Sequence, residues 1–291
     1  MSLHTSPQAE RWLLTIRPQR PLRHLEHPGS MLRGLFGHAL KQRLCRCGQE
    51  KHHADCAYQL IFEPQPPQNW PARYQDCPPA YVISPQPAPE GVLRAAFTLM
   101  GPALTYRHLL PEVWKNAIAR GLGESAVPAE LQAITPQALT PLPSNTHSLK
   151  LTFSSPLLLK RKRFGQTESQ PLEAHEITPT DLLLALHRRL ALLQPLYQAP
   201  GIQLPPLEQW LGLADGLELH SELQTTYFRR RSNRQQRQMT LCGLVGDIYL
   251  SGAFTPELLN ALSIGQWFNL GGKASFGMGS YQLSSRYSLA Y

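Results

Sequence analysis

Apolar and polar positions recur along the first half of the chain in patterns that predict alternating strands and helices. Arg11–Gln19 alternates as a half-buried strand does, whereas Gly29–Leu44 repeats apolar residues at spacings of three and four, as a helix does. Ser30 is expected to cap that helix. Two strands, a helix and a short strand should follow, over Ala80–Ser84, Val92–Met100, Leu104–Leu122 and Leu131–Leu139.

The second half repeats this order of elements without repeating the residues. We expect a strand, a helix, a strand pair, a helix and a last strand, over Leu149–Leu159, Thr180–Tyr197, Leu217–Arg230, Gln238–Leu250, Thr255–Phe268 and Ser275–Leu283. Thr255 should cap the second helix, which has Pro256 in its first turn. Each half therefore has the β-α-β-β-α-β order of a ferredoxin-like unit.

These patterns predict an α+β protein built from two tandem ferredoxin-like, or RRM-like, domains. A proline-containing stretch near Pro143–His147 marks the expected boundary, which gives domains at residues 1–145 and 146–291. The first domain carries a Cys/His-rich and Pro-rich insertion at about residues 45–79, between its first helix and its second strand.

Charge narrows the class of partner. Lys and Arg number 28 against 20 acidic residues, for a formal net charge of +8. Such an excess favours a phosphate-bearing partner, although a basic soluble enzyme would also fit. The chain has no apolar run long enough to span a membrane and no secretory signal, so no membrane partner is expected. Five cysteines in no dense framework are typical of a reduced, cytoplasmic protein.

A glycine-rich segment precedes the last predicted strand. Its candidate ligand-binding residues are the glycines with the lysine and serine between them: Gly271, Gly272, Lys273, Ser275, Gly277 and Gly279. Glycines let backbone N–H groups approach a phosphate closely. The spacing differs from the phosphate loop of nucleotide hydrolases, which precedes a helix. A tight turn with a bulge is the alternative interpretation.

Two basic clusters are further candidates for binding nucleic acid. The first combines arginines with an amide side chain: Arg229, Arg230, Arg231, Asn233, Arg234 and Arg237. Arginine forks pair with phosphates, amides can contact base edges, and the adjacent Tyr227 and Phe228 can stack on unpaired bases. The second cluster is expected in a loop before the second-domain helix: Lys160, Arg161, Lys162 and Arg163. A solvated basic hairpin tip or loop is the alternative for each.

Thiols and imidazoles gather in the insertion. Cys45, Cys47, Cys56 and His52 form a set that suits tetrahedral zinc, with His53 or Cys77 as other choices for the fourth ligand. The alternative is a set of reduced thiols without metal. Any zinc here would be structural and would leave the chemistry to other residues.

Four stretches, in order, carry a resemblance to a known family. They are Leu32–Leu40, the segment from Cys56 to Glu63, Arg231–Gly246, and Leu259–Tyr281 with its glycine-rich end. Together they resemble the CRISPR repeat-processing endoribonucleases of the RAMP superfamily, and Leu151–Leu159 fits the strand that opens that family's second domain. The resemblance spans almost the whole chain, although no single stretch decides it.

The resemblance implies two ferredoxin-like domains that bind CRISPR repeat RNA. It also implies cleavage of precursor crRNA without a metal cofactor, by attack of a 2′-hydroxyl that leaves a 2′,3′-cyclic phosphate. Some members stay bound to the product beside other subunits of an effector complex, and some relatives have lost cleavage. A non-catalytic crRNA-binding subunit is therefore an alternative, as is an unrelated basic enzyme whose glycine-rich segment binds a nucleotide.

Histidine suits both proton transfers of such a cleavage, because its pKa lies near neutrality. The family places its histidine after the first strand or in the first helix, which here gives the candidates His24, His27 and His38. A surface loop for the first two, or helix packing for His38, is the alternative role. The cations expected to stabilise the transition-state charge are Arg23, Arg33, Lys41 and Lys273.

Overall fold

A computed structural model describes residues 8–22, 27–47, 52–53, 55–68, 70, 77–199, 201–232 and 237–285. For 229–232 and 237–239 it describes the backbone alone. The chain forms two compact units, one of residues Met1–Gln137 with Leu193–Gly201 and one of Ala138–Leu192 with Ile202–Tyr291. Among the described helices, none combines the length and the apolar character needed to cross a membrane.

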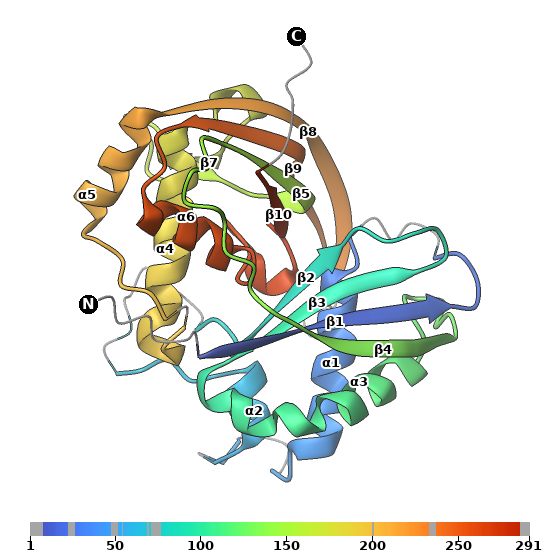
Figure 1. Ribbon diagram of the computed structural model, residues 1–291. Coiled ribbons are helices and arrows are strands. Elements are labelled where there is room, and N and C mark those ends of the chain that lie inside the picture. The colour runs from blue at the N-terminus through green and yellow to red at the C-terminus, as the bar shows by residue number, and fades with distance from the viewer. Residues whose placement is uncertain are drawn as a thin grey trace. The chain divides into compact units, whose positions relative to one another are not determined.

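The first unit contains a four-stranded antiparallel sheet in the order β2-β3-β1-β4. Its strands are β1 (Ala9–Pro18), β2 (Tyr81–Gln86), β3 (Leu93–Met100) and β4 (Ala129–Gln137). The helices are α1 (Gly29–Leu44), the short α2 (Ala57–Phe62), the 3₁₀ helix η1 (Gly101–Leu109) and α3 (Leu110–Ala119). Figure 1 shows α1 and α3 on one face of this sheet, which is the ferredoxin-like arrangement.

An aromatic cluster joins α1 to the sheet. Phe36 is fully buried, and its ring lies 4.8 Å from that of Phe97, 5.1 Å from that of Tyr81 and 5.1 Å from that of Trp114. Because these rings come from α1, β2, β3 and α3, they fix the helix layer against the sheet. Burial of such large apolar side chains is the main stabilising term for a unit of this size.

The second unit repeats the topology, with a four-stranded sheet in the order β10-β5-β9-β8. Its strands are β5 (Ser148–Leu157), β8 (Leu217–Ser232), β9 (Arg237–Gly252) and β10 (Tyr281–Ser284), and a small hairpin pairs β6 (Lys160–Lys162) with β7 (Ser169–Pro171). The helical elements are η2 (Ala174–Glu176), α4 (Pro179–Tyr197), α5 (Leu207–Gly212), η3 (Leu213–Gly216), α6 (Pro256–Gly265) and η4 (Ala274–Phe276), although the end of α4 from Leu193 on belongs to the first unit.

The core of this second unit follows from the sequence pattern. Alternate residues of β5 are buried, including Leu151 and Phe153. Phe153 packs 5.5 Å from the ring of Tyr281, whose hydroxyl donates to the Leu262 carbonyl oxygen at 2.7 Å. Thr255 caps α6 as predicted, since its hydroxyl accepts from the Leu258 N–H at 3.3 Å.

Several local predictions are wrong. Pro28 occupies the N-cap position of α1, so Ser30 lies inside the helix and does not cap it. The helix predicted over Leu104–Leu122 is divided into η1 and α3, because Pro111 lacks the N–H that would continue an α-helix through that point. The last strand begins at Tyr281 rather than Ser275, since residues before it form η4 and a turn.

Candidate nucleic-acid interface

The glycine-rich segment is held against β5 by backbone hydrogen bonds within the second unit. The Gly272 N–H donates to the Leu158 carbonyl at 2.8 Å, and the Gly279 N–H donates to the Pro156 carbonyl at 2.9 Å. Gly279 has a φ of +71°, and a Cβ there would lie 1.8 Å from the Leu270 carbonyl oxygen. Only glycine fits this position, so the predicted tight turn is present.

The turn also contains backbone N–H groups in an arrangement that suits an anion. Lys273 is left-handed, with φ 60° and ψ 23°, and the right-handed η4 follows it. This succession directs neighbouring N–H groups to one side and forms a concavity that favours anions. Within the described part of the chain, the N–H groups of Lys273, Ala274 and Ser275 donate no hydrogen bond. The exposed Lys273 side chain adds a positive charge.

His38 is the candidate histidine that faces solvent. It projects from α1 on the side away from the buried Phe36. Partial burial lowers the pKa of His38, and the positive charges of Arg120 and Lys41 lower it further. A lowered pKa keeps the imidazole neutral near physiological pH, which is the form that accepts a proton. Arg120 escaped the sequence interpretation because it follows α3, far from α1 along the chain.

Of the other two candidate histidines, the structure describes only His27. His27 is half-buried, and both of its ring nitrogens are shielded from solvent. His24 lies outside the described residues, as does Arg23, one of the cations considered for charge stabilisation. Of the two described histidines, His38 is therefore the one accessible to a large polymeric substrate.

Arg33, another cation considered for catalysis, packs against aromatic side chains of the first unit. Its guanidinium donates to the Tyr81 hydroxyl at 2.8 Å and lies 4.7 Å from the centre of the Phe62 ring. Phe62 in turn fits over Gly37, where any Cβ would meet the ring at 2.2 Å. Part of the Leu32–Leu40 motif therefore forms the surface of α1 against which α2 packs. Arg33 is used in this packing, whereas Lys41 is the α1 cation whose charge acts on His38.

The predicted basic hairpin is present as the end of the β8–β9 pair. The backbones of Arg229, Arg230 and Arg231 pair with those of Thr240, Met239 and Gln238. Asn233 and Arg234 lie outside the described residues, and the side chains of Arg229, Arg230, Arg231 and Arg237 are not described. Just before this end, Tyr227 is 66% exposed, so its ring is accessible for stacking on an unpaired base.

The second basic cluster departs from its prediction. It forms strand β6 rather than a loop. Arg161 pairs with the carboxylate of Asp181 and donates to the Glu176 carbonyl at 2.9 Å, while Arg163 pairs with the carboxylate of Glu176. These two arginines stabilise the approach to α4, so a phosphate would have to compete for them. Lys160 and Lys162 are exposed, and RNA contact by them stays a prediction.

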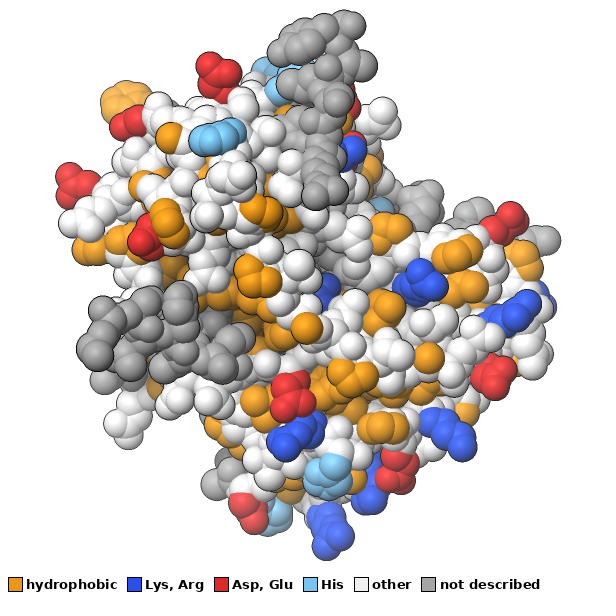
Figure 2. All heavy atoms as spheres, viewed as in Figure 1, with side chains coloured by type: hydrophobic (Ala, Val, Ile, Leu, Met, Phe, Trp, Pro, Cys, Tyr) orange, Lys and Arg blue, Asp and Glu red, His pale blue; other side chains and the backbone are white. Residues whose placement is uncertain are grey.

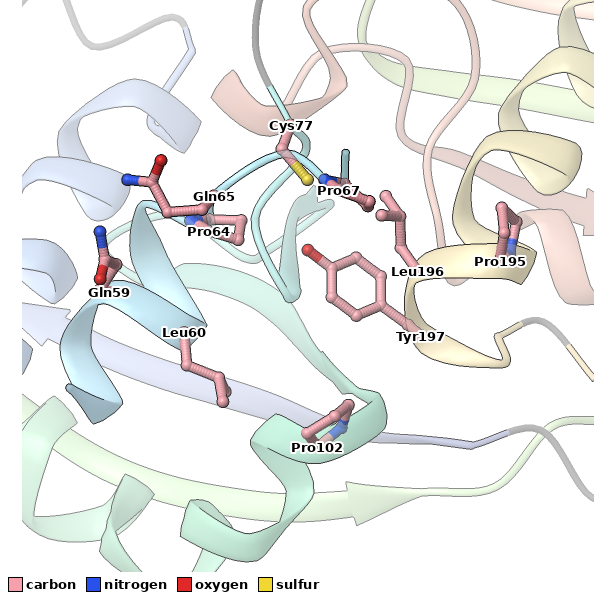
Figure 3. A pocket seen from close by; sticks show the side chains of 10 residues that line it. All are labelled: Gln59, Leu60, Pro64, Gln65, Pro67, Cys77, Pro102, Pro195, Leu196 and Tyr197. Carbon is pink, nitrogen blue, oxygen red and sulfur yellow. The ribbon is translucent and has the colours of Figure 1, made fainter. Parts of the chain in front are cut away.

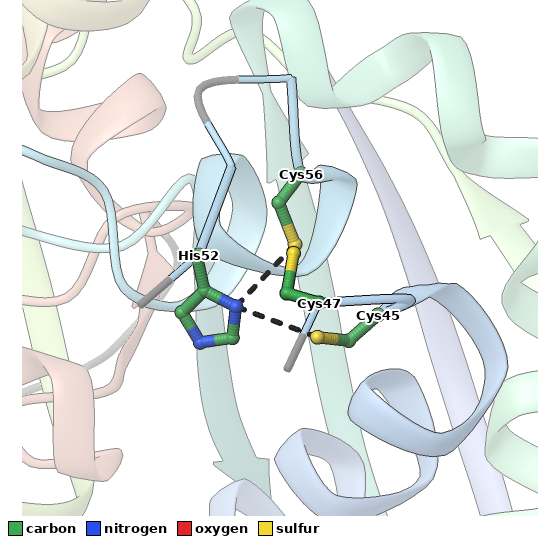
Figure 4. A group of neighbouring side chains, drawn as sticks. All are labelled: Cys45, Cys47, His52 and Cys56. Carbon is green, nitrogen blue, oxygen red and sulfur yellow. Dashed lines mark hydrogen bonds between the residues drawn. The ribbon is translucent and has the colours of Figure 1, made fainter. Parts of the chain in front are cut away.

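The predicted Cys/His set comes together in the first unit (Figure 4). The ligand atoms of Cys45, Cys47, His52 and Cys56 all lie within 4.8 Å of one another. His52 Nδ1 is 3.4 Å from Cys45 Sγ and 3.6 Å from Cys56 Sγ. His53 contributes only its backbone N–H, to Cys47 Sγ at 3.2 Å. The arrangement therefore favours His52 over His53 and Cys77 as the fourth member.

A pocket of about 310 Å³ lies elsewhere in the first unit (Figure 3). Prolines and leucines make up most of its lining, together with Cys77 and Tyr197. Burial raises the pKa of the Cys77 thiol, so this thiol is a weak nucleophile. Among the described residues that line it, none carries a charge for phosphate chemistry, so these residues offer no catalytic centre.

The cations of the first unit form no single patch on the face shown in Figure 2. Lys and Arg side chains are scattered there among apolar and uncharged ones.

Comparisons with known proteins agree with this geometry. Residues 8–151 match a family model described as an N-terminal domain, and residues 151–281 match that of the CRISPR-associated endoribonuclease Cas6. Comparison with curated proteins finds no match. These matches divide the chain close to the point where the second ferredoxin-like set of strands begins.

Solved structures share the fold over nearly the whole length. A Cas6 product complex is 19% identical, with a TM-score of 0.57, and the alignment covers 96% of this chain and 100% of that one. Thermus thermophilus Cas6 is 15% identical, with a TM-score of 0.55 and the same coverage of 96% and 100%. A RAMP protein that binds different RNA substrates is 8% identical, with a TM-score of 0.54, covering 94% and 99%.

Proposed function

Through residues 151–281, the chain belongs to the family of the CRISPR-associated endoribonuclease Cas6, and on that premise we propose that it binds CRISPR repeat RNA and cuts precursor crRNA. The family match supports the substrate class, and two features of the structure support the proposed binding. The N–H concavity at Lys273–Ser275 suits a phosphate, and the exposed Tyr227 near the arginine-rich hairpin end suits an unpaired base.

The observation that carries the cleavage step is the exposed His38 beside two cations. In this proposal, neutral His38 takes the proton of the 2′-hydroxyl, and the 2′-oxygen attacks the adjacent phosphorus. Lys41 and Arg120, whose charges lower the pKa of His38, stabilise the additional negative charge of the pentacoordinate phosphorus. The bond to the 5′-oxygen breaks, and a 2′,3′-cyclic phosphate remains on the upstream fragment.

The departing 5′-oxygen needs a proton from a second group, for which His24 is the proposed candidate, because the shielded ring nitrogens of His27 do not meet solvent in this structure. The nucleophile is already part of the RNA, so no metal-activated water is required. This is why we propose a metal-independent reaction. We further propose that the product RNA stays bound beside other subunits of an effector complex.

The test is single-turnover cleavage of a synthetic hairpin carrying a CRISPR repeat, in buffer with EDTA. His38→Ala should reduce the rate constant by about 10²–10⁴ with RNA affinity nearly unchanged. His108→Ala, which removes an exposed histidine from η1, is the matched control and should cleave like the parent protein.

Two outcomes would contradict the proposal. If His38→Ala cleaves at the parental rate, the assignment of His38 as the base is wrong. If the parent protein binds the hairpin tightly and never cuts it, the non-catalytic crRNA-binding subunit becomes the better description.

A further inference from the structure

We propose that Cys45, Cys47, His52 and Cys56 bind a structural Zn²⁺ ion that ties the end of α1 to the start of α2. Three thiols and one imidazole form a soft donor set with no carboxylate, which suits Zn²⁺ rather than Mg²⁺ or Ca²⁺. This inference is independent of the proposed cleavage, because it concerns how the first unit is held together.

The distances fit a tetrahedral ion. With bonds of about 2.3 Å to sulfur and about 2.0–2.1 Å to nitrogen, neighbouring ligand atoms lie roughly 3.5–3.8 Å apart. The two separations from His52 Nδ1, 3.4 Å and 3.6 Å, are already close to that edge length. The widest separation in the set is within 4.8 Å, so closing on the ion requires movements of roughly 1 Å in flexible thiol side chains.

Two neighbouring side chains hold the His52 ring in the orientation that metal binding needs. Its Nδ1 faces the sulfur atoms, while its Nε2 lies 4.0 Å from a carboxylate oxygen of Glu63. Metal-binding histidines usually direct their second nitrogen to such an acceptor, which fixes the ring and raises its basicity. The Tyr58 ring packs 5.2 Å from the His52 ring and limits its rotation. Glu63 and Tyr58 are therefore positioning residues in this proposal.

Two of the four proposed zinc ligands lie at helix ends. Cys45 is the C-cap of α1, its N–H donating to the Lys41 carbonyl at 3.0 Å, and Cys56 is the N-cap of α2. The N-terminus of α2 has no side-chain cap, and α2 has only six residues. Because so short a helix is not stable by itself, a metal bridge at its N-cap would stabilise it directly.

Elemental analysis of the purified full-length protein tests the proposal, with Co²⁺ substitution as the second measurement. We expect about one equivalent of zinc, and intense visible absorption from tetrahedral Co²⁺ bound to thiolates. His52→Ala should lose the metal, and His53→Ala should keep it, because its backbone N–H contact to Cys47 remains. Cys242→Ser should also keep it, since Cys242 lies in β9 of the other unit.

The positioning role of Glu63 is tested by a separate measurement of zinc affinity. Glu63→Gln should weaken zinc binding by about 10–100-fold in a chelator competition without changing the four ligands. Far less than one equivalent of zinc in the parent protein, together with no tetrahedral Co²⁺ spectrum, would overturn the proposal. So would retention of the metal in His52→Ala with its loss in His53→Ala. The parent measurements decide the question even where a variant fails to fold.

Discussion

Phe36 and His38 lie two positions apart on α1 and meet opposite environments. Two positions turn a helix by about 200°, so one side chain enters the core and the other faces solvent. Phe36 is fully buried among aromatic rings, whereas His38 is exposed beside two cations. The apolar spacing in the sequence predicted both residues on one helix. It could not predict that Arg120 lies near His38, because only the tertiary fold brings the end of α3 beside α1.

The pH dependence of cleavage follows from the lowered pKa of His38. Its neutral form is the base, so the rate should fall as pH drops through the folded-state pKa, which lies below the usual value of about 6.5. Partial burial and the charges of Arg120 and Lys41 cause the lowering. Arg120→Gln removes one charge, which should raise the pKa and move the acidic limb toward neutral pH.

A pH–rate profile at saturating protein concentration and constant ionic strength measures this shift. Arg107→Gln is the control, since Arg107 pairs with Glu10 at 3.4 Å and is no cause of the His38 shift. An acidic limb that stays in place in Arg120→Gln would argue against His38 as the titrating base.

Two glycines of the glycine-rich segment should differ sharply in their tolerance of alanine. At Gly279 the added Cβ would lie 1.8 Å from a backbone oxygen at a φ of +71°. At Gly272 the nearest atom would be the Leu158 side chain at 3.2 Å, which can move. Gly279→Ala should therefore lower the free energy of unfolding by about 1–3 kcal/mol, while Gly272→Ala should have a small effect.

Urea unfolding of both variants tests this expectation, and RNA binding gives a second reading. If the turn presents N–H groups to phosphate, Gly279→Ala should also weaken RNA binding more than Gly272→Ala does. Equal stability of the two variants would mean that the turn relaxes without cost.

Among the elements, those with a long regular pattern were predicted well and the short ones were not. The bounds of α1 follow from apolar spacing alone, and the structure confirms Gly29–Leu44. The six-residue α2 has no such pattern, since it is held by contacts such as Phe62 over Gly37. The predicted strand at Ser275 fails for the same reason: hydrogen bonds from Gly272 to Leu158, just after β5, and from Gly279 to Pro156 in β5 shape a turn there.

The end of the β8–β9 hairpin should provide salt-dependent affinity for RNA. Replacing Arg230, Arg231 and Arg234 with Ala should weaken binding by roughly one to several kcal/mol. It should also reduce the steepness of the salt dependence. A variant that makes fewer phosphate contacts releases fewer counterions from the RNA when it binds. Binding measured at several salt concentrations gives both quantities.

The matched control replaces the same three arginines with lysine, which keeps charge but loses the planar fork. A parental salt dependence with weaker affinity in this control would indicate forked contacts to phosphate. Unchanged affinity in the alanine variant would remove the hairpin end from the interface.

At the scale of the whole molecule, the order of elements was enough to predict the fold. Both sheets have the strand order of a ferredoxin-like unit, and the family resemblance is confirmed by the match over residues 151–281. Which side chains meet was harder to predict. Arg161 and Arg163 looked like free cations in the sequence, yet both pair with acidic residues near α4. A run of charges does not reveal which of its members already have a partner.

The reaction assigned to the intact protein makes a prediction about the RNA itself. A repeat hairpin with a single 2′-deoxy nucleotide at the cut position should bind with nearly parental affinity and should not be cleaved. The reason is that the 2′-hydroxyl is the only nucleophile in the proposed reaction. Cleavage of the unmodified hairpin in EDTA should leave a 2′,3′-cyclic phosphate and a 5′-hydroxyl, which mass spectrometry of the fragments identifies. Fragments ending in a 3′-hydroxyl and a 5′-phosphate would instead require water as nucleophile, and they would refute the proposed role of His38 as base for the 2′-hydroxyl.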